Sequence, residues 1–189
     1  MTTLDPTEFA VQLRGFSYTA FRLELQRQYH EEGEPEAVAK FLAGHPEPAT
    51  ANPGLRDWYA QVEQQTSQGR RVERVRVHDD PPTDYQRWER WIDTWNVDAG
   101  ETIHYLTRDR AQEIELLPAA GTLNPSRAAG AVDWWLLDSN RLIVMHFDEV
   151  GRRLHNELVV DPAMVVQACA WRDLAIHHSA PSGLRNAVT

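Results

Sequence analysis

Two histidines and a glutamate have the types and spacing of a metal-binding group. His146 lies in one apolar run, and His155 and Glu157 lie in the next, after a turn. If the two runs form an antiparallel hairpin with residue 147 opposite residue 154, His146 faces His155, and Glu157 shares that surface. Two imidazoles and a carboxylate can bind zinc or a similar divalent ion. A shift of one residue breaks the arrangement, and the spacing matches no standard zinc motif, so we favour a solvated polar face.

A second group of chemical interest surrounds Pro81-Pro82, where a predicted strand ends and a helix begins. Ligands of open sheets often bind at such ends, and three carboxylates there can coordinate magnesium or accept protons from a hydroxylated ligand. The simpler interpretation is that Thr83 or Asp84 caps the helix and that the acids stabilise its positive end. We still expect this turn to be the better place for a binding pocket, with the candidate residues Asp79, Asp80, Asp84, Tyr85 and Arg87.

Two tryptophan groups are candidates for contact with a protein partner. One is a helical stripe, and the other is an adjacent pair whose side chains point to opposite faces of a strand. Core packing is the simpler interpretation, but tryptophan is enriched in protein interfaces. The adjacent pair also requires a second covering layer or a partner, because one of its side chains faces away from the main core. The candidates are Trp88, Trp91, Trp134 and Trp135.

The sequence holds no complete catalytic set. Asp173 and His177 lie one helical turn apart, which is half of a hydrolase triad without its nucleophile. The single cysteine, Cys169, excludes an internal disulfide framework and the multi-cysteine zinc sites. Neither the phosphate-binding nor the dinucleotide-binding glycine motif is present. We therefore expect no catalytic residues and no cofactor.

The composition limits the classes of function. The chain has 19 basic and 28 acidic residues, a formal charge of −9, whereas nucleic-acid binding needs a basic surface. The predicted helix 83–98 carries Arg87 and Arg90, but its acids offset them, which disfavours direct DNA binding. No apolar run approaches the length of a membrane span, and residues 1–8 lack the pattern of a secretory signal. We expect a cytoplasmic protein.

The hydrophobic periodicity changes at Gly69. Residues 1–69 read as an N-terminal helical region, including a helix after Ser17 in which Phe21, Leu25 and Tyr29 form the apolar stripe. Residues 70–178 predict an α+β sheet domain of order β-α-β-(loop)-β-β-β-α. Its strands are expected near 72–77, 103–106, 134–137, 142–147 and 154–160, and its helices at 83–98 and from 161. Residues 118–131 read as a loop and 179–189 as a flexible tail.

Five segments carry a resemblance to a known family: AFRLE at 20–24, GRRVERVRV at 69–77, TDYQR at 83–87, WWLLD at 134–138 and WRDLA at 171–175. In this order they resemble an uncharacterised actinobacterial domain family (DUF6879-like) that is often encoded beside helix-turn-helix regulators. The resemblance implies a regulatory role with a protein partner. The element order of 72–178 also resembles one half of a phospholipase-D-type domain. Because the His-x-Lys signature of those enzymes is missing, that likeness implies a degenerate, non-catalytic relative.

These observations lead to two hypotheses. The first is a non-enzymatic interaction or regulatory module that acts with a helix-turn-helix transcription regulator and senses a small ligand. Its acidic surface would engage the basic face of a DNA-binding partner. The alternative is a metal-dependent hydrolase or transferase that uses the His146/His155/Glu157 or the Asp79/Asp80/Asp84 group. That alternative requires the side chains to converge in one cleft.

Overall fold

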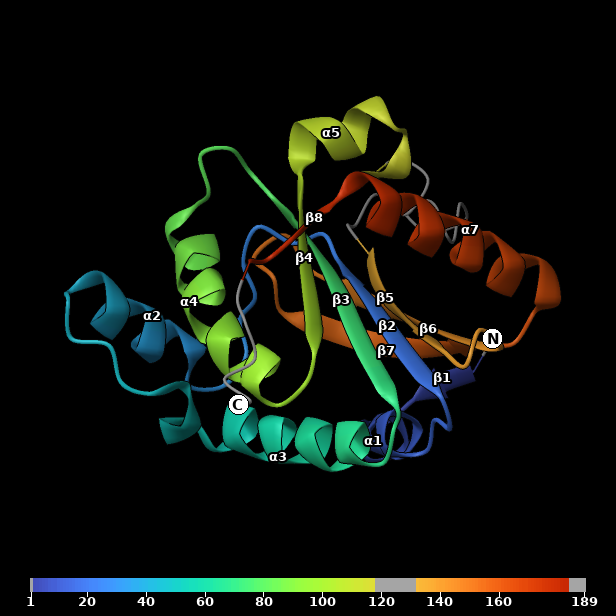
Figure 1. Cartoon of the computed structure of the whole chain (residues 1–189), viewed down its shortest axis with the longest axis horizontal. Coiled ribbons are helices and arrows are strands. Elements are labelled where there is room, and N and C mark those ends of the chain that lie inside the picture. Colours follow the sequence, from blue (N-terminus) through green and yellow to red (C-terminus); the bar gives the residue numbers. More distant parts are fainter. Residues whose placement is uncertain (1, 118–131, 184–189) are drawn as a thin grey trace.

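The computed structural model of the chain describes residues 2–117 and 132–183. In these ranges eight strands form one mixed sheet in the order β1-β7-β6-β5-β2-β3-β4-β8 (Figure 1). The strands are β1 (Thr2–Leu4), β2 (Thr19–Glu24), β3 (Arg71–His78), β4 (Thr102–Thr107), β5 (Val132–Leu137), β6 (Arg141–Phe147), β7 (Arg153–Val159) and β8 (Ala180–Pro181). The central strands β2, β3 and β4 are parallel, and the remaining pairs are antiparallel.

Helices cover both faces of the sheet (Figure 1). They are α1 (Pro6–Arg14), α2 (Glu34–Leu42), the 3-10 helix η1 (Ala49–Ala51), α3 (Pro53–Ser67), α4 (Asp84–Asp98), α5 (Arg108–Glu113) and α7 (Pro162–His178). Residues of α5 and α7 pack on one face, here called the α7 face. Residues of α1, α3 and α4 pack on the other, here called the α4 face.

The two faces have separate hydrophobic cores. Trp134 packs on the α7 face and Trp135 on the α4 face, so the adjacent pair points to opposite sides as predicted. A second layer of helices, rather than a partner, covers the outward member of the pair. The α+β class is confirmed, with helices interleaved between strands along the chain.

The prediction of a helical region over residues 1–69 is confirmed for α1, α2 and α3 but is wrong for the helix expected after Ser17. Thr2–Leu4 is the edge strand β1, and Thr19–Glu24 is β2, at the centre of the sheet between β3 and β5. Phe21 and Leu25 suit a strand as well as a helix, because Leu23 between them completes an alternating pattern on the α7 face. The polar residues between them face α4 instead of water. The sheet therefore takes strands from both sides of Gly69.

The predicted elements after Gly69 are confirmed where the structure describes them. The predicted loop 118–131 and the last part of the predicted tail, 184–189, lie outside the described residues. The start of that tail is not loose, because Ala180–Pro181 pairs with β4 as strand β8. None of the helices in the described ranges has the length and apolar character required to cross a membrane.

Candidate functional site

Charged side chains occupy the α4 face of the two central strands. Along β2 the apolar residues Phe21 and Leu23 face α7, so Arg22 and Glu24 face α4. Along β3 the valines at 75 and 77 face α7, so the intervening polar residues also face α4. Sheets with helices on both faces bury both sides of their central strands. These charges must therefore be paired inside the protein.

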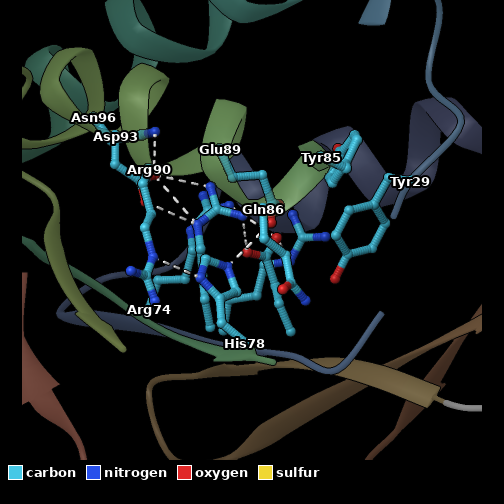
Figure 2. Close-up of polar contacts among 12 residues, drawn as sticks. Tyr29, Arg74, His78, Tyr85, Gln86, Glu89, Arg90, Asp93 and Asn96 are labelled. Atoms are coloured by element: carbon cyan, nitrogen blue, oxygen red, sulfur yellow. Dashed lines mark hydrogen bonds and ion pairs between the residues drawn. The ribbon is translucent and has the colours of Figure 1, made fainter. Parts of the chain in front are cut away.

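The pairing takes the form of a buried network centred on two arginines (Figure 2). Arg74 donates from Nε to Glu101 Oε1 at 2.8 Å and from Nη1 to Glu24 Oε1 at 2.9 Å. Arg76 donates from Nη2 to Asp93 Oδ1 at 2.9 Å, and its Nη1 contacts both Glu24 and a glutamate of α4, Glu89. Glu24 thus bridges the two arginines. Glu89 and Asp93 of α4 bind Arg76 of β3 and so attach the helix to the sheet.

His78 is locked in one neutral form at the edge of this network. Arg90 donates from Nε to His78 Nδ1 at 3.1 Å, so the ring proton is on Nε2, which lies 3.2 Å from Glu89 Oε2. Burial, followed by the charges of Arg76 and Arg90, lowers the pKa of His78 to about 3. The imidazole therefore stays uncharged at neutral pH and acts as a hydrogen-bond bridge between two residues of α4.

A cavity of about 220 Å³ opens onto the network. Its polar wall is formed by Arg22, Glu24, Arg74, Arg76 and Glu89, and its apolar wall includes Tyr29, Trp58, Tyr85 and Trp135. Tyr29 and Tyr85 lie beside each other at one end of the cluster, with ring centroids 6.0 Å apart (Figure 2). Aromatic walls with a few fixed polar groups are typical of small-molecule sites.

A larger groove of about 660 Å³ adjoins this cavity, because Glu31, Glu34 and Leu55 line both. Five glutamates and one lysine are among its lining residues: Glu31, Glu32, Glu34, Glu36, Glu47 and Lys40. Lys40 Nζ is held by Glu36 at 2.8 Å and by Glu47 at 3.0 Å. The groove is therefore acidic, and Glu34 stands where the two hollows meet.

Two acids of the cavity region respond differently to the nearby arginines. Burial raises the pKa of Glu24, but Arg22, Arg74 and Arg76 lower it more strongly, to about 2. Burial raises the pKa of Asp133 to about 6 although Arg22 lowers it. Glu24 is thus a permanent anion that the three guanidinium groups share.

Two other glutamates hold protons near neutral pH. Burial raises the pKa of Glu34 to about 7, and the hydrogen bond that Tyr85 donates to it, at 2.9 Å, offsets this only in part. Burial also raises the pKa of Glu89 to about 8, although Arg76 lowers it and Glu24 raises it further. Strongly shifted carboxyl groups in a cavity are typical of functional sites.

The described wall of the cavity includes no serine, threonine, cysteine or lysine. Aliphatic hydroxyl, thiol and amine nucleophiles are therefore missing from this described wall, whose hydroxyl groups are those of Tyr29 and Tyr85. What the wall does offer is an aromatic surface, fixed hydrogen-bond partners and a carboxyl group that exchanges its proton near pH 7. This arrangement supports ligand binding and proton transfer.

Residues 7–183 match the family described as "Domain of unknown function (DUF6879)". The chain belongs to this family. The match includes the elements that build the cavity and the buried network. No curated protein matches the chain. The family description assigns no activity to this DUF6879 domain. The actinobacterial origin and the neighbouring regulator that the resemblance implied stay predictions.

Of the predicted ligand-binding residues of this DUF6879 domain, only Tyr85 lines the cavity. Asp79 is held by two arginines, with 3.1 Å from Arg27 Nε to Oδ2 and 3.1 Å from Arg108 Nε to Oδ1. These contacts lower its pKa against the effect of burial. Asp79 therefore serves to tie the ends of β2, β3 and β4 together.

The remaining residues of the Pro81-Pro82 turn are surface groups. Asp84 pairs with Arg87 at 3.2 Å, both side chains being exposed, and Asp80 is exposed. Thr83 caps α4 as predicted, since its Oγ1 accepts from the backbone N–H of Gln86. None of the three aspartates lines either hollow, and α4 borders both hollows through residues that follow Asp84.

The tryptophan candidates are mostly internal. Trp88, Trp134 and Trp135 are 1% exposed or less, so they cannot contact a partner in this conformation. Trp91 is half-buried and lines the acidic groove, so it alone remains a candidate contact. Trp135 has a different role from the predicted one, because it forms part of the cavity wall under the guanidinium of Arg22.

The hairpin group comes together on the α7 face. The predicted pairing of His146 with His155 is confirmed, whereas residue 147 lies opposite Arg153 rather than Leu154, because a bulge follows His146. The preference for a solvated polar face is wrong, since His146 is only 8% and Glu157 only 5% exposed. One ligand atom from each of the three residues lies within 4.8 Å of the other two, which is close enough for the three side chains to bind one metal ion.

Sequence reasoning missed the residues that build the cavity, above all Glu34 and the arginines of β2 and β3. One signal was available. A strand that alternates valine with arginine between two helices is buried on both faces, so its arginines need acidic partners in those helices. That pattern predicts that Arg74 and Arg76 are buried. It does not name Glu34, whose position depends on how the chain before α2 folds against α4.

Proposed function

We propose that this DUF6879 domain is a binding module that takes an organic cation in the cavity between the sheet and α4. One observation carries the proposal. Each arginine of the described wall has a carboxylate partner: Arg22 and Glu24, Arg74 and Glu101, Arg76 and Asp93, Arg153 and Glu31. Within the described residues the Glu34 carboxyl group has no such ion pair, and its hydrogen-bond partner is the hydroxyl group of Tyr85. A cationic ligand would supply the missing partner.

The aromatic residues of the cavity suit the same ligand class. Cations are attracted to the faces of aromatic rings, and Tyr29, Tyr85 and Trp58 belong to the wall. A cavity of about 150 Å³ is known to hold benzene, so 220 Å³ is sufficient for an ammonium group attached to one ring or a short aliphatic body. The acidic groove beside the cavity would raise the local concentration of such a cation.

The test is a titration of the whole chain with ammonium probes of increasing apolar size, from methylammonium to phenethylammonium. Calorimetry is run in buffers of different ionisation enthalpy. We expect the arylalkyl ammonium ions to bind more tightly than the alcohols of the same shape. Near neutral pH, binding should release a proton from Glu34, because a nearby cation lowers the pKa of a carboxyl group. The enthalpy should then depend on the buffer.

The variant Glu34→Gln keeps the shape of the side chain but removes its charge. Its affinity for the best ammonium probe should fall by about tenfold or more, as expected for the loss of a buried charge partner, and proton release should disappear. Glu63→Gln, on the exposed face of α3, is the matched control and should bind like the parent chain. The proposal is wrong if no ammonium ion binds better than its matched alcohol, or if Glu34→Gln binds as tightly as the parent.

The regulatory part of the hypothesis is retained as a proposal. In it, ligand occupancy changes how the domain engages a helix-turn-helix regulator in the cytoplasm. The formal charge of −9 suits a partner with a basic DNA-binding face. Purification of the chain together with a helix-turn-helix regulator of the kind that the resemblance implies, at low and at high salt, tests this proposal. A clean failure to bind at low salt would remove it.

The alternative hypothesis is a metal-dependent hydrolase or transferase, and the structure does not favour its group Asp79/Asp80/Asp84. Asp79 is engaged by two arginines and Asp84 by Arg87, so that group is not favoured. The likeness to a phospholipase-D-type half domain stays a prediction of a non-catalytic relative. The second group, His146, His155 and Glu157, shares no residue with the cation cavity.

A further inference from the structure

His146, His155 and Glu157 form a compact group on the α7 face, on the side of the sheet opposite the cation cavity. His146 and His155 are cross-strand partners of β6 and β7, and Glu157 is the next residue of β7 on the same face. Two strands of a continuous sheet fix the backbones of all three residues. Such positioning is more exact than a loop would provide.

The side chains already lie near the geometry that a metal requires. The imidazole rings are stacked with centroids 4.3 Å apart and an angle of 11° between planes. His146 Nε2 lies 2.9 Å from Glu157 Oε2, and one ligand atom from each residue lies within 4.8 Å of the others. Ligand atoms around a tetrahedral zinc ion are separated by roughly 3.3–3.4 Å, given metal–ligand bonds of about 2.0–2.1 Å. Small side-chain rotations bridge this difference.

The surroundings also suit a metal. His146 and Glu157 are buried and His155 is half-buried, so an ion would be shielded on the sheet side and reachable from the side of His155. Two nitrogen ligands and one carboxylate oxygen favour zinc and neighbouring transition metals over magnesium or calcium, which prefer oxygen ligands only. The described residues thus supply two nitrogen ligands and one oxygen ligand to such an ion.

We propose that His146, His155 and Glu157 bind a divalent transition-metal ion of the zinc class. This site does not depend on the proposed function, because the cation cavity lies on the α4 face and shares no residue with it. Failure of either proposal leaves the other standing.

The experiment uses the untagged full chain, freed of metal and titrated with Zn²⁺ or Co²⁺ alone. We expect one equivalent of Zn²⁺ to bind. Co²⁺ should develop the intense visible absorption of a four- or five-coordinate nitrogen–oxygen site. In long-range nitrogen spectra of the imidazoles, Zn²⁺ should shift the ring signals of two histidines, His146 and His155, and leave the exposed His45 unchanged.

Variants identify the ligands. His155→Ala and Glu157→Gln should each weaken Zn²⁺ binding by about a hundredfold, with loss of the Co²⁺ spectrum, while His45→Ala serves as the matched control and should bind like the parent. Glu157→Gln preserves the size of the side chain and its ability to form hydrogen bonds. The spectra of the parent chain test the site without any variant, so the test remains valid even if a variant fails to fold. The proposal is overturned if the parent binds no stoichiometric Zn²⁺, if other histidines shift instead, or if folded His155→Ala and Glu157→Gln retain the parent affinity.

Discussion

Glu24 and Glu34 line the same cavity but have opposite ionisation behaviour. Burial raises the pKa of both, yet three arginines bring that of Glu24 down to about 2, whereas Glu34, bonded to a tyrosine, has a pKa of about 7. A buried carboxyl group without a cation nearby is more stable with its proton. At the residue scale, the difference between Glu24 and Glu34 therefore comes from the three arginines that surround Glu24.

The first prediction concerns the pH dependence of stability. An acid whose pKa is higher in the folded chain binds an extra proton when folded, so stability is complete below the unfolded pKa and is lost as the pH rises towards the folded pKa. For Glu34 this window extends from 4.5 to about 7. Across it, the parent chain should lose on the order of 3 kcal/mol of unfolding free energy relative to Glu34→Gln, at about 1.4 kcal/mol per pKa unit.

Urea unfolding at a series of pH values measures this difference. Other titrating groups, including His78, are present in both proteins and cancel in the comparison. Glu63→Gln is the control and should follow the parent curve, because that side chain is exposed. Parallel curves for the parent and Glu34→Gln would contradict the shifted ionisation of Glu34.

At the scale of the elements, the turn between β6 and β7 holds the segment that lines the cavity. Gly151 accepts a backbone hydrogen bond from His30 at 3.0 Å. It has a φ of +83°, and an added Cβ would lie 2.3 Å from the carbonyl oxygen of Gln28. Only glycine permits both this backbone conformation and this approach. The turn thereby fixes Tyr29 and Glu31 at the cavity.

The second prediction follows from this contact. Gly151→Ala should lower the free energy of unfolding by more than the roughly 1–3 kcal/mol typical of a strained backbone conformation, because the backbone of Gln28 must also move. Gly44→Ala is the matched control, since Gly44 has a φ of +79° with nothing within 4 Å of the added Cβ. Urea denaturation compares the two. Equal losses would show that the approach to Gln28 has no energetic effect.

At the scale of the whole molecule, the sheet is a single unit whose centre comes from the first part of the chain. β2 pairs with β3 on one side and with β5 on the other, so β3 and β5 do not pair with each other. Removing β2 exposes two unpaired strand edges and opens both hydrophobic cores. The sheet of residues 70–178 therefore depends on residues 1–69.

The third prediction is that a fragment of residues 70–183 does not fold alone. Circular dichroism on heating should show no cooperative transition, and its amide signals should be poorly dispersed, whereas residues 1–183 should melt cooperatively. Separate expression of 1–69 followed by mixing is a further check, because it can restore β2. A fragment that melts like the longer chain would contradict the central role of β2.

Local sequence patterns predicted much of the second half of the chain. The Thr83 cap, the opposite orientations of Trp134 and Trp135, and the pairing of His146 with His155 were all accessible from the sequence. Caps and adjacent hairpins involve neighbours along the chain, so their physics is local. The three residues of the proposed metal site follow from the same local hairpin pattern.

The cavity could not be predicted from local sequence patterns. Phe21, Leu25 and Tyr29 fit a helix as well as a strand, and pairing with β3 and β5, far away in sequence, decides for the strand. The same pairing turns Arg22 and Glu24 from apparent surface charges into buried ones. Sequence alone thus determined element types, caps and hairpin register, whereas tertiary structure alone decided which charges are buried and which acid lacks a cation. The reason is that burial and charge pairing depend on contacts between distant segments, which no local pattern records.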